Sequence, residues 1–339
     1  MLKSAHNEIQ REDQAGRKFG GFDSVVKMAN FVVRKRSPQE LTQEDIDALL
    51  KWTTDEGMAP YVRPNDISHM YSGPPYLDVK VFFGFLDGKR IGHVALITLG
   101  KDGDVMQYIT MFIVEKPLRG KGYGLKIWKA MWECRDTSAN ICLDSITTMM
   151  SQYESMGLNI IGWDNREYII SLSAITEKYK MTESIGNVSA KPLSEVEFDK
   201  FDEYNAKVYG LHRTVFIKRW ATLPESFTWV AVNENDDTVG CITIREGADK
   251  QDAIVGPWYS DNLEIAKKLI YTAAQTMSSQ TSSKNLRMLM CSPAGKSNAI
   301  QMIENDFGVK PGFIAVRMCS KKPKVDVSKV IAIHSSGYN

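Results

Sequence analysis

A glycine-rich segment between an apolar run and an amphipathic run constrains this chain more than any other feature. The segment reads Arg119-Gly120-Lys121-Gly122-Tyr123-Gly124. Residues 109–114 before it are mostly apolar, and residues 125–132 after it carry apolar side chains at helical spacing. The predicted order is therefore strand, glycine-rich turn and helix. Glycines allow the backbone to approach a bulky group, and the first N–H groups of a helix have no partner within the helix.

The charge of this turn favours an anionic ligand. The helix dipole places partial positive charge at the helix N-terminus, and Arg119 and Lys121 add two full charges. Helix N-termini built in this way bind phosphate and pyrophosphate groups. We therefore predict a pyrophosphate site, and the alternative is a flexible basic loop ahead of a surface helix.

Two common nucleotide-binding motifs do not fit the turn. A Walker A loop requires Gly-Lys followed by Ser or Thr, whereas Gly122 is followed by Tyr123. A dinucleotide-binding fold requires GxGxxG near the start of a βαβ unit, whereas this turn lies far into the chain. The turn instead resembles the (Arg/Gln)-x-x-Gly-x-(Gly/Ala) signature of the GNAT acetyltransferases, with Arg119, Gly122 and Gly124 at the matched positions. The resemblance implies a site for the pyrophosphate of acetyl-CoA.

The predicted strands and helices of the first half follow the order of a GNAT domain. Thr42 is a predicted N-cap, and Asp87-Gly88 is a strong signal for a hairpin turn. We expect strands at 31–34, 79–86, 89–97, 105–114 and 141–144, helices at 42–50, 64–71, 125–132 and 148–157, and a hairpin formed by 160–163 and 168–172. The resemblance thus extends over about half of the chain.

The second half repeats this plan with little shared sequence. We expect helices at 195–210, from Asp261 onward and at 299–307, and strands at 227–232, 239–245, 253–259, 286–290 and 313–318. The C-terminal half of bacterial YitH-type acetyltransferases is similar at Tyr209 to Arg213, Trp220, Gly240 to Arg245 and Gly256 to Tyr259. This resemblance implies a divergent GNAT-like unit. A second glycine-rich string is missing from the sequence, and Asp261, a predicted N-cap, would repel a pyrophosphate.

The length of 339 residues favours two domains over a single core. The expected fold class is α+β, with two GNAT-like domains, each a mostly antiparallel twisted sheet flanked by helices. We expect a polar N-terminal extension at 1–21, an acetyl-CoA-binding domain at 22–183 and a second, divergent domain at 184–339. The second domain is predicted to be mainly non-catalytic toward CoA and to shape or bind the acceptor.

Composition excludes several classes of partner. The formal net charge is +1 and the basic residues are scattered, so nucleic acid is not expected. The sequence has no apolar run near the ~20 residues of a membrane span, and its N-terminus is polar, so we expect a cytoplasmic protein. Five cysteines without a CxxC pair argue against a metal site and for a reducing compartment. Monomer and homodimer both remain open.

The GNAT resemblance implies that CoA contacts two neighbouring segments. The pyrophosphate is expected on Arg119, Gly120, Lys121, Gly122, Tyr123 and Gly124. In this family the fourth strand separates from the fifth, and the pantetheine arm pairs with the exposed edge. The matching edge residues here are Phe112, Ile113 and Val114. These residues would contact the pantetheine arm through the main chain, so their side chains can also be part of the core.

The resemblance places Tyr153 where several family members have their general acid. The segment Tyr153 to Gly157 matches a Tyr-x-x-x-Gly pattern, and Leu158 stands where Phe is usual. The alternative for Tyr153 is a half-buried helical tyrosine. The general base stays open among Tyr108, Asp104, Glu115, His93 and a chain of waters. The region that lines the acceptor pocket in this fold contains Trp52, Tyr61, Tyr71 and Tyr76.

The resemblance implies an acetyl-CoA-dependent N-acetyltransferase in which a primary amine attacks the thioester directly in a ternary complex. One alternative is a non-catalytic acyl-CoA sensor or interaction protein. Another is transfer of a longer acyl group, for which Met149-Met150 would line a wider tunnel or serve as core filler. The acceptor itself, a small amine or a protein amine, is not identified by the sequence.

Overall fold

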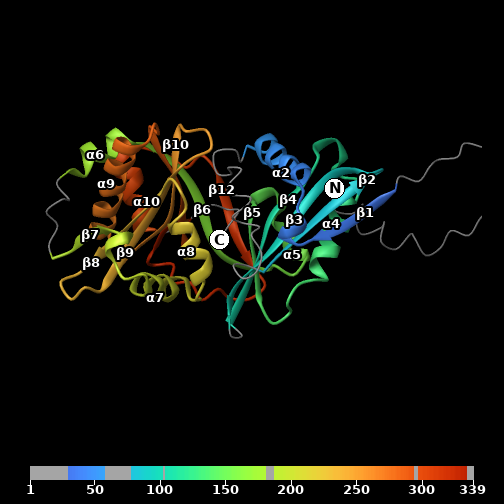
Figure 1. Cartoon of the computed structure of the whole chain (residues 1–339), viewed down its shortest axis with the longest axis horizontal. Coiled ribbons are helices and arrows are strands. Elements are labelled where there is room, and N and C mark those ends of the chain that lie inside the picture. Colours follow the sequence, from blue (N-terminus) through green and yellow to red (C-terminus); the bar gives the residue numbers. More distant parts are fainter. Residues whose placement is uncertain (1–29, 58–77, 102–103, 181–186, 294–296, 334–339) are drawn as a thin grey trace, which may run out of the picture. The chain divides into compact units, whose positions relative to one another are not determined.

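The computed structural model describes residues 30–57, 78–101, 104–180, 187–293 and 297–333 (Figure 1). The helix predicted at 64–71, together with Tyr61, Tyr71 and Tyr76, lies outside the described residues. From Phe31 onward the chain forms one compact unit. That unit is built on a single sheet with the strand order β1-β2-β3-β4-β5-β12-β6-β11-β13-β10-β9-β8-β7.

The first four strands form an antiparallel meander that the sequence predicts well. They are β1 (Phe31–Arg36), β2 (Asp78–Leu86), β3 (Lys89–Lys101) and β4 (Asp104–Val114). Asp87 and Gly88 both have positive φ, 48° and 82°, as the tight turn between β2 and β3 requires. The predicted hairpin is confirmed. The next strand, β5 (Asn140–Ile146), runs parallel to β4.

The two halves exchange one strand each, as the middle of Figure 1 shows. The long strand β6 (Ile160–Ser171) pairs with β11 (Asn285–Ser292) of the second half, from Asp164 opposite Ser292 to Ser171 opposite Asn285. In return, β12 (Ile314–Cys319) lies between β5 and β6. The sheet therefore continues from one half into the other.

The hairpin predicted at 160–163 and 168–172 is wrong. Residues 164–167 read as a turn because they are Asp, Asn, Arg and Glu. Within the long strand their polar groups find partners on other strands instead. Asn165 donates to Asp144 of β5 at 2.9 Å, and Glu167 accepts from Arg287 of β11 at 2.9 Å. These partners are distant in sequence, so a local pattern does not reveal them.

The remaining strands belong to the second half: β7 (Ser189–Pro192), β8 (Ser226–Val232), β9 (Thr238–Glu246), β10 (Asp252–Ser260) and β13 (Val330–Ile333). The helices are α2 (Gln43–Asp55), α4 (Tyr123–Trp132), α5 (Met150–Ser155), α6 (Leu172–Lys178), α7 (Phe198–Tyr209), α8 (Thr214–Ala221), α9 (Leu263–Gln280) and α10 (Asn298–Phe307). The sequence predictions did not include β7, β13, α6 and α8.

Two predicted helix caps have different outcomes. Thr42 caps α2, because its hydroxyl accepts from the N–H of Asp45 at 3.3 Å and the Asp45 carboxylate accepts from the N–H of Thr42 at 2.9 Å. The cap predicted at Asp261 is wrong by one residue. Asn262 caps α9 and accepts from the N–H of Ile265 at 3.0 Å.

Alternation along the strands divides the first half into two cores. Phe83 of β2 packs in a cluster with Trp52 of α2, whereas its neighbour Phe82 packs in a cluster with Trp128 of α4. Successive strand residues point to opposite faces, so α2 and α4 lie on opposite faces of the sheet. The α2 cluster also contains side chains of α7 and α8, such as Tyr209, which bind the second half to this face.

Candidate functional site

The glycine-rich turn has the backbone geometry of an anion-binding site. Gly120 and Gly122 have φ of 77° and 80°, a region that glycine enters without strain. A Cβ added at either would have no described atom within 4 Å, so the space outside the turn is open. Gly124 is different, because its ideal Cβ position lies 3.3 Å from Val114 Cγ2 and 3.4 Å from Phe112 Cζ. Gly124 thus brings α4 close to the end of β4.

The N-terminus of α4 lacks a side-chain cap because its N-cap residue is Gly122. The first intrahelical bond runs from the N–H of Lys126 to the carbonyl of Gly122 at 3.2 Å. The N–H groups of residues 123–125 precede that bond and have no acceptor within the helix. The first turn reads Tyr-Gly-Leu-Lys and so carries no acid to compete for these donors.

Arg119 ties the turn to its surroundings while adding positive charge. Its Nε donates to the carbonyl of Val114 at 2.8 Å, and its Nη2 lies 2.6 Å from Glu56 Oε1 just after α2. Its side chain is 45% exposed, so an anion in solvent can reach it. With Lys121 beside it, the turn has the charge and the donors that suit a pyrophosphate.

The edge of β4 next to the turn is open toward β5. The two strands pair only from Met106 opposite Asn140 to Tyr108 opposite Cys142. Beyond that point β5 pairs with β12, while Ile113 and Val114 pair with β3 on the other side. The predicted pantetheine-binding segment, Phe112 to Val114, lies along this separated edge.

A β-bulge shapes the same edge. Met111 has φ of 52°, and the register of β3 and β4 shifts beside it. Its carbonyl accepts from His93 Nδ1 at 3.0 Å, which places that ring proton on Nδ1. Burial lowers the pKa of the fully buried His93 to about 4. His93 is therefore a weak base at neutral pH, and its visible role is to order the bulge.

Tyr153 lies on the same face of the sheet as α4. It is 8% exposed, and burial raises its pKa to about 12, so the phenol stays protonated at neutral pH. Among the described residues its hydroxyl has no hydrogen-bond partner. Its ring packs on Trp128 of α4, with centroids 5.4 Å apart, and Trp128 packs on Phe112 at 5.5 Å. Trp128 thus connects Tyr153 to the β4 edge.

In the sequence, Trp128 is only an apolar position in an amphipathic helix, a pattern that ordinary core residues share, so its place beside the site was not predictable. The other candidate bases have structural partners. Tyr108 donates to Asp144 at 2.9 Å, and burial raises its pKa well above the ordinary value. Asp104 pairs with Lys324 at 2.9 Å.

The last of the acidic candidates, Glu115, accepts from Trp52 Nε1 at 3.3 Å. Trp52 itself is buried against β2 and is part of the core. Within the described ranges, no group of three or more His, Cys, Asp or Glu side chains is arranged to hold a metal ion. None of the described helices is both long and apolar enough to cross a membrane.

A buried polar network lies where β4 and β5 separate. Arg317 of β12 donates from Nε to Asp144 Oδ1 at 2.6 Å and from Nη2 to Oδ2 at 3.0 Å. Tyr108, the last residue of β4 paired with β5, and Asn165 of β6 also donate to Asp144. This network was not among the sequence predictions. The only indication in the sequence was one charged residue in each of two largely apolar strands, Asp144 in β5 and Arg317 in β12.

The corresponding helix of the second half lacks the features of an anion site. Asn262 caps the N-terminus of α9, and Glu264 lies in its first turn. Asp261 accepts from the Tyr204 hydroxyl at 3.0 Å and pairs with Lys329 at 2.8 Å. Two carboxylates and an occupied N-cap make this end of α9 a poor pyrophosphate site.

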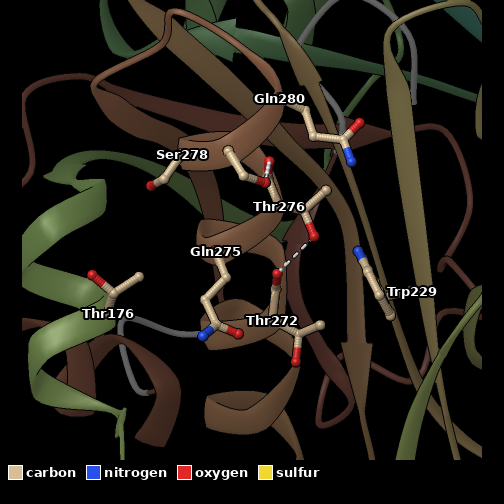
Figure 2. Close-up of a pocket in the computed structure, with 8 residues that line it drawn as sticks. Thr176, Trp229, Thr272, Gln275, Thr276, Ser278 and Gln280 are labelled. Atoms are coloured by element: carbon tan, nitrogen blue, oxygen red, sulfur yellow. Dashed lines mark hydrogen bonds between the residues drawn. The ribbon is translucent and has the colours of Figure 1, made fainter.

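A groove of about 590 Å³ runs along the C-terminal part of α9 (Figure 2). Its lining is uncharged and comes from α6, β8 and α9: Thr176, Trp229, Thr272, Gln275, Thr276, Ser278, Ser279 and Gln280. Thr276 Oγ1 donates to the carbonyl of Thr272 at 2.9 Å, so this hydroxyl is already used by the helix. The groove contains none of the residues predicted to bind CoA.

Known proteins resemble this chain in sequence and in fold. Residues 202–331 match the family model of the acetyltransferase (GNAT) domain. Holothin acyltransferase of Pseudoalteromonas sp. (strain SANK 73390) is 24% identical over 193 residues, which cover 57% of this chain and 60% of that protein. The match therefore spans about three-fifths of the length of this curated relative. The family match falls in the second half, outside the glycine-rich turn.

Two solved structures share the fold over most of the chain. A putative acetyltransferase from Pyrococcus horikoshii has a TM-score of 0.65 and 14% identity, covering 95% of this chain and all (100%) of the other. A tandem GNAT protein from the clavulanic acid biosynthesis pathway has a TM-score of 0.60 and 13% identity, covering 86% and 98%. At these identities the likeness is one of fold.

Proposed function

We propose that this chain, a member of the GNAT superfamily, transfers an acetyl group from acetyl-CoA to a primary amine. The amine would attack the thioester directly in a ternary complex. The observation that carries the proposal is the turn from Arg119 to Gly124, at an uncapped helix N-terminus beside a separated strand edge. Acetyl-CoA would supply an activated acyl group. The chain's own residues would bind it, orient it and move protons.

We propose that the pyrophosphate binds to Arg119, Gly120, Lys121, Gly122, Tyr123 and Gly124. The support is the set of helix N–H groups that precede the first intrahelical bond, together with the two cations. The pantetheine arm would pair with the main chain of Phe112, Ile113 and Val114. The support here is that the pairing of β4 with β5 stops at Tyr108.

We propose Tyr153 as the general acid. Attack of the neutral amine on the thioester carbonyl forms the C–N bond and breaks the C–S bond. The nitrogen gives up one proton to water, and the departing thiolate takes one from Tyr153, which water then reprotonates. Tyr153 is protonated at neutral pH, and Trp128 holds its ring next to the residues of the β4 edge. A purely structural role for this tyrosine is the competing explanation.

We propose that residues 22–183 form the CoA-binding domain and that residues 184–339 shape the acceptor site. Side chains of α7 and α8 pack in one cluster with α2 of the first half, which supports a shared acceptor region on that face. The acids at the start of α9 support the absence of a second CoA site. The name of the holothin acyltransferase relative is consistent with acyl transfer.

The proposal is tested by mixing the full chain with acetyl-CoA and a panel of amines and measuring released thiol. Amine-dependent thiol release, with a product heavier by one acetyl group, is expected. CoA binding without turnover on any amine would indicate a sensor or interaction protein instead. A series of acyl-CoA thioesters of rising chain length separates acetyl transfer from transfer of longer groups.

A further inference from the structure

Arg213 is a buried cation held by neutral groups. It precedes α8 and is 3% exposed. Its Nε donates to Asn205 Oδ1 at 3.1 Å, and its Nη2 donates to the Tyr259 hydroxyl at 2.7 Å. Its Cζ lies 3.7 Å from the centre of the Tyr209 ring. Among the described residues, its Nη1 has no hydrogen-bond partner.

Two other arginines of the described fold, the buried Arg317 and the half-buried Arg287, have acidic partners. Arg317 contacts both oxygens of Asp144, and Arg287 lies 2.7 Å from Asp252. Arginine stays protonated in proteins, and burying its charge away from water is unfavourable unless a nearby anion offsets the lost hydration. In the described part of the chain no carboxylate lies within ion-pairing distance of Arg213. A small anion on Nη1 would remove that imbalance.

The surroundings of Arg213 connect the second half to β4, the strand that carries the proposed pantetheine-binding edge further along. Tyr209, whose ring lies against Arg213, donates its hydroxyl to Met106 Sδ on β4 at 3.8 Å. Tyr209 and Phe216, whose rings lie next to the Arg213 guanidinium, belong to the cluster that the second half shares with α2. Arg213 thus contacts side chains of the cluster around which the acceptor region is proposed.

One acid lies near Arg213 in the sequence of α7 and must be considered. Asp202 is 7% exposed, and its Oδ2 accepts from the Thr214 hydroxyl at 2.6 Å. Its Oδ1, like Arg213 Nη1, has no partner among the described residues. An ordered water molecule would satisfy either group. The experiment therefore has to separate a structural role of Arg213 from a role in ligand binding.

We propose that Arg213 binds a carboxylate group of the amine acceptor. The inference rests on the proposed acetyl transfer and adds the chemical class of the acceptor, an amine that also carries a carboxylate. A planar guanidinium matches a carboxylate, and burial strengthens the interaction because water is excluded. The acceptor must displace part of the aromatic cover to reach the guanidinium.

The test uses matched pairs of amines that differ only in a carboxylate: α-amino acids with their decarboxylated amines, and ω-amino acids of rising length with the corresponding alkylamines. Thiol release from acetyl-CoA gives kcat and KM for each. We expect the carboxylate-bearing member of at least one pair to be preferred. Arg213→Met should raise its KM by about 10- to 100-fold, the scale of a lost charge-assisted hydrogen bond. The partner amine should be little affected.

Two controls keep folding apart from binding. Lys218→Met removes an exposed cation from α8 that lies over the Phe198 ring at 5.2 Å, and it should keep the carboxylate preference. Arg213→Lys keeps the charge without the guanidinium fork, and it should keep part of the carboxylate preference. This variant serves as the test if Arg213→Met does not fold. The rise in melting temperature with CoA reports whether each variant retains the CoA site.

A wild-type protein without any carboxylate preference would overturn the inference, as would an Arg213→Met variant that keeps the preference. If CoA binds but no amine is acetylated, the proposed function fails separately. Calorimetry of the same carboxylates on the CoA-bound protein then decides the inference. Binding that Arg213→Met abolishes supports a carboxylate site, and equal binding or no binding leaves Arg213 a structural residue.

Discussion

Arg317 of β12 and Asp144 of β5 form a buried ion pair between residues 173 positions apart in the chain. Their side chains are 1% and 0% exposed. β12 belongs to the second half and β5 to the first, so the ion pair joins the exchanged strand β12 to the sheet of the first half. It also lies at the point where β4 and β5 separate. The proposed CoA-binding edge therefore depends on a strand supplied by the second half.

Arg317→Met is expected to lower the free energy of unfolding by about 3–5 kcal/mol, because it leaves the Asp144 carboxylate buried without its cation. Urea denaturation followed by circular dichroism measures this change. Replacing both partners by apolar residues, as in Arg317→Met with Asp144→Leu, should recover much of the loss. Lys51→Met breaks the exposed pair of Lys51 with Asp55 and should change stability far less. Equal losses in the two single variants would contradict a special cost of the buried pair.

CoA or acetyl-CoA is expected to raise the melting temperature, because a ligand that binds only the native state stabilises it. Gly122→Glu should abolish this rise by placing a carboxylate in the open space outside the turn. Gly308→Glu is the matched control, since Gly308 also has positive φ and an open Cβ position but follows α10. A rise that survives in the Gly122 variant would place the CoA site elsewhere.

Calorimetry on the full chain is expected to give one CoA per chain. The N-terminus of α9 is capped by Asn262 and carries Glu264 in its first turn, whereas that of α4 is uncapped and follows two cations. The Gly122→Glu variant should then bind no CoA. Two sites of similar affinity would contradict the prediction that the second half lacks a CoA site.

Tyr153→Phe is expected to reduce the rate by about 10²-fold or more, because it removes the proposed proton donor and keeps the ring. CoA affinity and melting temperature should change little. Burial raises the pKa of Tyr153 to about 12, so the protonated, active form persists to high pH. An alkaline limb of the rate due to this phenol would lie near 12 rather than near the ordinary value of about 10.

Tyr168→Phe is the control for this experiment, since it removes a hydroxyl that donates to Glu304 at 2.6 Å. It should affect stability and leave the turnover of the folded protein unchanged. If Tyr153→Phe retained wild-type turnover with reduced stability, its hydroxyl would be structural and the acid would be water or another side chain.

Acid is expected to destabilise the fold through His93. Burial lowers its folded pKa to about 4 from an ordinary value of about 6.5, so the unfolded chain binds the proton more tightly. The resulting stability is complete above about pH 6.5 and is lost as the pH falls through 4. His93→Gln should flatten the decrease of the melting temperature between pH 7 and 4. The exposed His212→Gln variant should not, and identical profiles for the two would rule out this role of His93.

Features with a local cause were predictable from the sequence. The turn at Asp87-Gly88 follows from backbone angles that glycine enters without strain, and the Thr42 cap follows from a hydroxyl three residues from its N–H donor. The order of strand, glycine turn and helix around Gly122, and the open geometry of that turn, likewise follow from the residues of the segment itself. The role proposed for Arg119 came from local charge and from a resemblance, that of Tyr153 from the resemblance alone, and both stay predictions.

The sequence by itself determined the local elements and the alternation that assigns their faces, because both depend on residues a few positions apart. Only the tertiary structure decided the strand exchange, the ion pair of Arg317 with Asp144 and the burial of Arg213 among neutral partners. The sequence pattern of polar residues 164–167 indicates a turn, but in the tertiary structure β5 and β11 supply partners for Asn165 and Glu167. An opposite charge offsets the cost of burying Arg317 and Glu167, and in both cases it comes from a strand more than a hundred residues away.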